Sequence, residues 1–234
     1  MTRRRWIADE VSGDRAAITG AHADHLVHVL RARPGQEFDI AVSGTVRRGC
    51  VAAVADGRVE FELGEEVAAP LIPNITLALS IFKFDRMEWA IEKCTELGAT
   101  RIVPIIARRT DTRLASAVPN RLDRWRRIAR QASEQSRRTS VPEIADPLNL
   151  KDAIHIAASL RVVLSEAEGT FFLKDVVTPA DEIALACGPE GGWTEDELEL
   201  FHAAGWISAS LGHTILRAET AAIAALAVVV SELH

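Results

Sequence analysis

The sequence predicts an α/β protein in two parts: a small N-terminal antiparallel sheet or β-barrel, then a larger parallel sheet covered by helices. In the N-terminal part, short apolar runs are separated by glycines, and residues 58–63 alternate strictly between polar and apolar side chains. After residue 73, strand-like and helix-like patterns alternate along the chain. Pro70 and Pro73 interrupt both patterns, so we expect domains at residues 1–72 and 73–234.

The N-terminal elements follow from glycine positions and alternation. A short helix is expected over residues 22–31. Strands are then expected over residues 37–44, 49–54 and 58–63, a spacing typical of a small antiparallel sheet.

The C-terminal part is expected to begin with a strand over residues 75–82. Asp85 and Glu88 have the spacing of a capping box for the next helix, and Gly98 marks its end. Later strands are short and apolar on both faces, as in a parallel sheet covered by helices. The remaining expected strands are 101–106, 160–165, 183–187 and 207–211, and the remaining helices begin near residue 120, at the Thr194–Glu197 capping box and at residue 219, the last running to residue 230.

Composition excludes several classes of protein. A chain of 234 residues with 48% hydrophobic and 26% charged residues is neither disordered nor fibrous. The longest apolar stretch, residues 220–230, is too short to span a bilayer, and no apolar segment follows the basic N-terminus, so we expect a cytoplasmic protein. The three cysteines, Cys50, Cys94 and Cys187, are too scattered for a disulfide framework or a thiolate zinc site.

Charge is distributed unevenly along the chain. The net charge is −6, yet residues 101–138 carry eleven arginines against three acidic residues. Residues 139–234 carry four basic and fifteen acidic residues. The arginine block is either a solvated helix face or a surface for a polyanion, since guanidinium groups suit phosphates and base edges.

A glycine-rich segment, residues 187–193 (CGPEGGW), lies between a buried strand and a capped helix. Ligands of α/β proteins bind at this edge, and glycines allow a ligand to approach the backbone closely. The segment lacks the spacing of a dinucleotide fingerprint and the lysine of a P-loop, which disfavours a nucleotide-binding regulator. An ordinary tight turn is the alternative interpretation.

A second glycine turn, residues 211–221 (LGHTILRAETA), again follows a strand and precedes a helix. Two such loops can line one pocket, and Arg217 and Glu219 are its candidate polar groups. By contrast, His22, His25 and His28 recur every three residues without a fourth ligand pattern, so we expect no metal site.

These motifs together resemble the RsmE family, the 16S rRNA (uracil-1498-N3)-methyltransferases of the SPOUT superfamily, over nearly the whole chain. One difference is that His213-Thr214 stands where family members commonly carry an arginine before the Ile-Leu-Arg stretch. The matching segments are 25–31 (HLVHVLR) with Pro34-Gly35, 83–98 (KFDRMEWAIEKCTELG), 134–136 (EQS) with 141–143 (VPE), 188–192 (GPEGG) and 215–221 (ILRAETA).

The resemblance implies a PUA-like RNA-binding barrel in the N-terminal domain, a trefoil-knotted methyltransferase domain, a homodimer with the last apolar helix at its interface, and S-adenosyl-L-methionine as the cofactor. The implied substrate is 16S rRNA in the small ribosomal subunit. The residues implied to bind the cofactor are Leu164, Gly188, Pro189, Glu190, Gly191, Gly192, Leu211, Gly212, Ile215, Leu216, Arg217 and Thr220.

Methylation at uridine N3 requires removal of a proton, so we expect Arg217 to stabilise the developing negative charge on the base and Glu219 to accept the proton. Two alternatives are a methyltransferase of the same fold that acts on tRNA or another rRNA site, and an RNA-binding protein without activity. The residues expected to contact RNA are Arg3, Arg4, Arg5, His25, Arg31, Arg86, Glu134, Gln135, Arg137 and Arg138.

Overall fold

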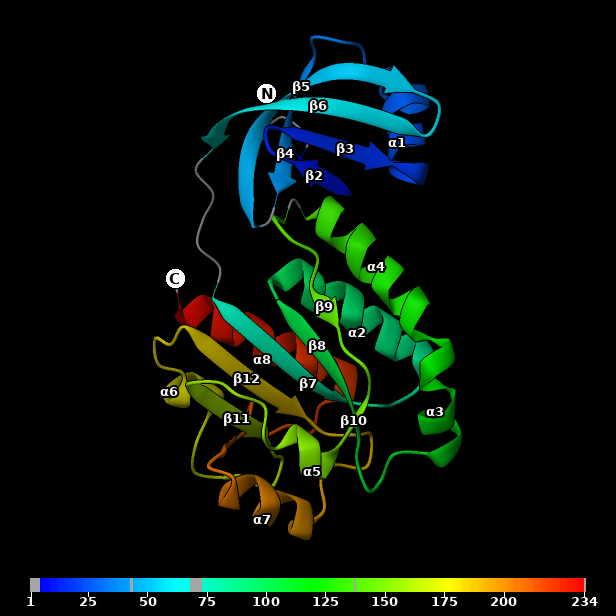
Figure 1. Cartoon of the computed structure of the whole chain (residues 1–234). Helices are drawn as coiled ribbons and strands as arrows, with labels where there is room; N and C mark the ends of the chain where they lie inside the picture. The colour runs from blue at the N-terminus through cyan, green and yellow to red at the C-terminus, as the bar shows by residue number, and fades with distance from the viewer. Residues whose placement is uncertain (1–4, 43, 68–72, 137, 234) are drawn as a thin grey trace. The chain divides into compact units, whose positions relative to one another are not determined.

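The computed structural model describes residues 5–42, 44–67, 73–136 and 138–233 (Figure 1). The chain divides into two compact units. The N-terminal unit contains residues 1–71 together with residues 133–141, and the C-terminal unit contains residues 72–132 and 142–234. Arg3, Arg4 and Arg137, which were expected to contact RNA, lie outside the described residues.

The N-terminal unit is a six-stranded sheet with strand order β1-β4-β5-β6-β3-β2. All its pairs are antiparallel except β1 with β4. The three expected strands are present, and the alternation over residues 58–63 places Val59, Phe61 and Leu63 in the core. The strands are β1 (Arg5–Ile7), β2 (Glu10–Ser12), β3 (Arg15–Thr19), β4 (Glu37–Val42), β5 (Thr45–Ala55) and β6 (Arg58–Val67).

Two local features shape this sheet. Gly49 lies inside β5 because the strand passes directly over Ile40: a Cβ at residue 49 would lie only 2.4 Å from Ile40 Cγ1. The expected helix over 22–31 forms as α1 (Gly20–Asp24) followed by a π-helical turn, η1 (His25–Val29). It ends before Arg31, whose φ of 52° cannot continue a right-handed helix.

The C-terminal unit is a seven-stranded sheet in which every pair is parallel. The strand order is β10-β8-β7-β12-β11-β13, with β9 paired to β8. This confirms the expected α/β fold with a parallel sheet. The strands are β7 (Asn74–Ser80), β8 (Arg101–Ile106), β9 (Glu143–Ile144), β10 (Leu148–Asn149), β11 (Leu160–Leu164), β12 (Glu182–Cys187) and β13 (Ile207–Ala209).

Helices cover both faces of this sheet. Figure 1 shows α2 (Phe84–Leu97) and α8 (Ala218–Glu232) behind it, and α5 (Leu150–Ala153) and α7 (Glu195–Ala203) in front. The core in front of the sheet joins the alanines of β12 to Ile154, Phe201 and Trp206. The other helical segments of this unit are α3 (Thr112–Ala117), η2 (Val118–Asn120) and α6 (Leu173–Val176), while α4 (Leu122–Gln135) runs from this unit into residues of the N-terminal unit.

The helix ends agree with the sequence in part. Gly98 ends α2 in the left-handed conformation, at φ 118°, and Thr194 and Glu197 form the expected capping box of α7. The capping box expected at Asp85 is wrong, because α2 begins at Phe84 and the cap position falls on Lys83, two residues before Asp85. The Glu88 carboxylate instead accepts two hydrogen bonds from Arg124.

Across the described ranges, no helix combines the length and apolar character needed to cross a membrane.

Candidate functional site

A cavity of about 430 Å³ lies at the carboxyl edge of the parallel sheet. Three neighbouring strands end there: Val163 of β11 pairs with Ala186 of β12, and Leu164 pairs with Ala209 of β13. Because parallel strands end at one edge, the loops that follow them converge on one space. The lining residues come from these loops and nearby helices: Arg86, Leu164, Ser165, Glu166, Ala167, Cys187, Gly188, Pro189, Glu190, Gly192, Trp193, Leu198, Ala209, Ser210, Leu211, Gly212, His213, Thr214, Ile215, Leu216, Arg217, Ala218 and Ala221.

The glycine-rich loop after β12 forms one wall of the cavity. It turns where the Gly192 N–H donates to the Pro189 carbonyl at 2.8 Å, and Gly192 adopts a φ of 69°. The Trp193 indole lies against Gly188, where a Cβ would come within 3.2 Å of the indole nitrogen. That nitrogen donates to the Leu164 carbonyl at 3.1 Å, so the tryptophan joins the loop to the end of β11.

The outer side of the same loop is held by Arg109, which follows β8. Its guanidinium donates to the carbonyls of Gly191 and Trp193. Gly191 does not line the cavity, although the sequence placed it among the cofactor-binding residues. A Cβ at Gly191 would lie 3.2 Å from Arg109 Cδ.

The second loop, between β13 and α8, forms the opposite wall. Gly212 has a φ of 140°, and Ile215 is 82% exposed beside the cavity. His213, which stands at the position where the sequence departs from the family pattern, lines the cavity and contacts the Phe172 ring edge-on, with ring centres 5.7 Å apart.

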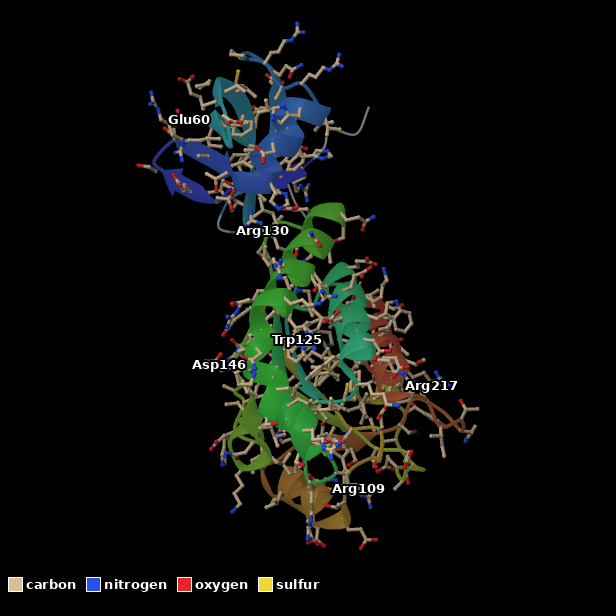
Figure 2. The ribbon with its side chains drawn as sticks, turned by 90° about the vertical axis from the view of Figure 1, so that its right-hand side faces the viewer. Glu60, Arg109, Trp125, Arg130, Asp146 and Arg217 are labelled. Carbon is tan, nitrogen blue, oxygen red and sulfur yellow. The ribbon has the colours of Figure 1, made fainter. Side chains whose placement is uncertain are left out.

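Charged side chains gather where this loop meets α2. Arg86 Nη1 donates to Glu190 Oε1 at 3.2 Å, and Arg86 Nε lies 3.7 Å from Glu219 Oε1. Glu219 is 4% exposed, and its Oε2 has no hydrogen-bond partner among the described residues. Arg217 is exposed beside the start of α8 and lines the cavity (Figure 2). One oxygen of the Glu219 carboxylate thus lies close to the Arg86 guanidinium, and the other is buried without a hydrogen-bond partner among the described residues.

Cys187 lines the cavity as a neutral thiol. Burial raises its pKa to about 12, and burial with the neighbouring Cys187 also raises the pKa of the Cys94 thiol. Because the thiolate is the nucleophilic form, Cys187 contributes apolar surface at neutral pH.

The expected cofactor-binding residues divide into two groups. Gly191 and Thr220 do not line the cavity, and neither does the expected proton acceptor, Glu219. Sequence reasoning missed residues 165–167, although their place directly after β11 could have indicated them. The expected residues that line it are Leu164, Gly188, Pro189, Glu190, Gly192, Leu211, Gly212, Ile215, Leu216 and Arg217.

The described residues expected to bind RNA belong to both units. Arg86 lies at the cavity of the C-terminal unit. In the N-terminal unit, Glu134 pairs with His22 at 2.9 Å, and Trp6 contacts the rings of His22 and His25. The other expected residues of this unit differ in exposure: Arg31 and Gln135 are exposed, Arg5 is half-buried, and Arg138 is 5% exposed with a pKa lowered to about 10 by burial.

Many arginines of the basic block bind other parts of the C-terminal unit. Arg108 pairs with Asp196, Arg124 with Glu88, and Arg126 with Asp146. Arg121 lies 4.8 Å above the Phe84 ring. The block therefore joins α4 and the β8 loop to their neighbours, in addition to providing positive surface.

Of the three spaced histidines, His22 and His25 both contact Trp6, whereas His28 has acidic neighbours. His28 lies with Asp24 and Asp56, and the ligand atoms of the three residues fall within 4.8 Å of one another. All three are exposed, as such groups commonly are without an ion.

Comparison with known proteins identifies the family. The RNA methyltransferase domain family matches residues 69–230. The ribosomal RNA small subunit methyltransferase E of Synechocystis sp. is 36% identical over 220 residues, which cover 90% of this chain and 71% of the relative. The chain belongs to the ribosomal RNA small subunit methyltransferase E family.

Solved structures support the family at the level of the fold. The structure of a ribosomal RNA small subunit methyltransferase E from Neisseria gonorrhoeae bound to S-adenosyl methionine matches with a TM-score of 0.82 and 32% identity, covering 97% of this chain and 96% of that one. A putative methyltransferase from Legionella pneumophila in complex with the same cofactor also matches at 0.82, with 28% identity and coverage of 98% and 97%.

Proposed function

We propose that this protein methylates N3 of a uridine in 16S rRNA, uracil-1498 in the family, with S-adenosyl-L-methionine as the methyl donor. The observation that carries the proposal is the cavity at the carboxyl edge of the parallel sheet. It is built from the two glycine loops in a member of the ribosomal RNA small subunit methyltransferase E family. A relative from Neisseria gonorrhoeae with the same fold was solved with S-adenosyl methionine bound.

The cavity suits this cofactor in size and chemistry. Its volume of about 430 Å³ lies within the usual range of small-molecule sites. Gly188 and Gly192 contribute backbone groups to its wall, while Leu211 and Leu216 offer apolar surface. The cofactor supplies a methyl group already activated by its sulfonium. The protein's work is then to orient the base and remove the N3 proton.

Glu219 is the proton acceptor in this proposal. Its buried Oε2 has no hydrogen-bond partner among the described residues and can therefore accept a proton, and Arg86 Nε lies 3.7 Å from Oε1. Arg217 at the cavity stabilises the negative charge that develops on the uracil oxygens as the proton leaves. Because Glu219 does not line the cavity, the proposal requires side chains at the cavity edge to move, and Arg86, which pairs with both Glu190 and Glu219, is the candidate.

The domain organisation is part of the same proposal. We propose a PUA-like RNA-binding barrel over residues 1–72 and a trefoil-knotted methyltransferase domain over residues 73–234. The six-stranded sheet supports the first assignment, and the two convergent loops of the parallel sheet support the second. RNA would contact arginines of both domains. The partly apolar α8 supports a homodimer through the methyltransferase domain. Action on the small ribosomal subunit would take place in the cytoplasm.

The test is incubation of the protein with labelled S-adenosylmethionine and three substrates: small ribosomal subunits from a strain that lacks its own enzyme, naked 16S rRNA and tRNA. Nucleoside mass spectrometry then identifies the product. We expect 3-methyluridine in the subunit sample. Label in tRNA alone would support a methyltransferase of another RNA, and cofactor binding without label in any sample would support an RNA-binding protein without activity.

A further inference from the structure

Arg109 lies outside the cavity, but it holds the loop that forms one of its walls. Its Nη1 donates to the carbonyls of Gly191 and Trp193, which lie on either side of Gly192. A guanidinium between two carbonyls fixes the directions of two peptide groups at once. Gly192 has a left-handed φ of 69°, so the two hydrogen bonds from Arg109 lie on either side of the turn.

The aliphatic part of Arg109 also packs on the loop. A Cβ at Gly191 would lie 3.2 Å from Arg109 Cδ and 3.6 Å from its Cβ. A glycine at position 191 therefore lets the arginine stem lie directly on the backbone. The φ of Gly191 is not in the left-handed region, so close packing, and not backbone conformation, accounts for glycine here.

The turn that carries Arg109 is itself fixed. The Ala107 N–H donates to Thr110 Oγ1 at 3.0 Å, and the Arg108 N–H donates to Glu197 Oε1 at 2.7 Å. Glu197 also forms the capping box of α7, which begins directly after the loop. The backbone next to Arg109 is thus hydrogen-bonded to α7, the helix that follows the loop.

We infer that Arg109 is a positioning residue for the cofactor: it holds the backbone of residues 188–193 in the shape that binds S-adenosylmethionine. The inference rests on the proposed function for the identity of the ligand. It assigns this arginine of the basic block to cofactor affinity and not to RNA. Without Arg109 the loop would have to become ordered when the cofactor binds, and this ordering would reduce the free energy of binding.

The first experiment measures cofactor affinity without RNA, by isothermal titration calorimetry of the full chain with S-adenosylmethionine. We expect Arg109→Ala to raise Kd about tenfold, the equivalent of losing one charge-assisted hydrogen bond. The Kd of Arg109→Lys should fall between those of wild type and Arg109→Ala, because an ammonium group keeps the positive charge but does not hold its donors where the guanidinium Nη1 lies. Arg108→Ala is the matched control, because its side chain pairs only with exposed Asp196 among the described contacts, and its Kd should stay within twofold of wild type.

A double-mutant cycle separates positioning from general loss of structure. Gly191→Ala should raise Kd several-fold, since the new methyl group pushes against Arg109 Cδ. In the Arg109→Ala background the same change should cost less than twofold, because the obstructing atoms are gone. Melting temperatures of the ligand-free variants show whether any loss of affinity merely follows loss of stability.

An unchanged Kd for Arg109→Ala, or effects of the two substitutions that simply multiply, would overturn the inference. Lower melting temperatures with unchanged affinity would assign Arg109 a purely structural role. If the wild-type protein bound no S-adenosylmethionine, the proposed function would fail as well. Normal binding by both wild type and Arg109→Ala would refute only the role of Arg109.

Discussion

Replacing Trp193 with phenylalanine tests how the cavity wall is held in place. The Trp193 indole is 8% exposed, and its N–H donates to the Leu164 carbonyl at 3.1 Å. Its ring also contacts Phe201 edge-on, with centres 5.0 Å apart. Phenylalanine keeps an aromatic ring but cannot donate the hydrogen bond. A buried carbonyl left without its partner costs about 1–3 kcal/mol, and the lost ring area costs about 1 kcal/mol more.

We therefore expect Trp193→Phe to lower the free energy of unfolding by about 2–4 kcal/mol and to weaken S-adenosylmethionine binding, because both partners of the lost bond line the cavity. Urea unfolding followed by circular dichroism measures the first effect, and calorimetric titration measures the second.

Two other tryptophans serve as controls. Trp125 is fully buried on α4 (Figure 2), but its indole nitrogen has no hydrogen-bond partner in the described part of the chain. Trp125→Phe should thus cost about 1 kcal/mol or less, since only ring area is lost. Trp89 is 48% exposed, and Trp89→Phe should change stability by no more than about 0.5 kcal/mol. If Trp193→Phe lowered the free energy of unfolding no more than Trp125→Phe does, the hydrogen bond from Trp193 to Leu164 would not stabilise the cavity wall.

Three further predictions concern chemistry, pH and packing. Glu219→Gln should lower the single-turnover rate of 3-methyluridine formation by about 100-fold or more with cofactor Kd unchanged, as expected for loss of a general base, and a rate within threefold of wild type would exclude that role. The free energy of unfolding should fall as pH rises from 9 towards 12, because native Cys187, with its pKa raised to about 12, keeps a proton that the unfolded chain loses above its ordinary pKa of 9.0. Unfolding curves of Cys187→Ala should show a shallower decline, and an equal slope would contradict the assignment. Gly49→Ala should destabilise the protein by about 1–3 kcal/mol in thermal or urea unfolding, since its Cβ would lie 2.4 Å from Ile40 Cγ1. A smaller loss for Gly49→Ala in the Ile40→Ala background than in wild type would show the clash as the cause, and equal losses would contradict it.

The parallel sheet was predictable because its strands are short apolar runs between capped helices. Thr194, Glu197 and Gly98 act through local hydrogen bonds or backbone conformation, which sequence spacing records directly. Asp85 illustrates the limit of that approach. Its spacing to Glu88 fits a capping box, but Glu88 binds Arg124, which lies 36 residues further along the chain.

The loops that line the cavity were predictable from the sequence because they follow strands. The contacts between residues far apart in the sequence were not. Gly188 and Leu211 follow strands of one sheet, so their convergence follows from topology. Arg109 contacts Gly191 across 82 residues of sequence, and Arg86 meets Glu190 across 104. The composition of residues 101–138 does not distinguish their arginines from one another. Only the fold shows which of them bind other residues of the chain and which are exposed to solvent.

The measurement that tests the central claim most directly is the position of the transferred methyl group. Small ribosomal subunits that lack the modification would be incubated with the protein and methyl-deuterated S-adenosylmethionine, and their 16S rRNA would be digested into fragments for mass spectrometry. We predict that one uridine-containing fragment gains a single trideuterated methyl group, located at N3 of that uridine, and that the Glu219→Gln protein labels the same fragment about 100-fold more slowly or not at all. Label on another base, at several unrelated positions, or on no 16S fragment would contradict the proposed function.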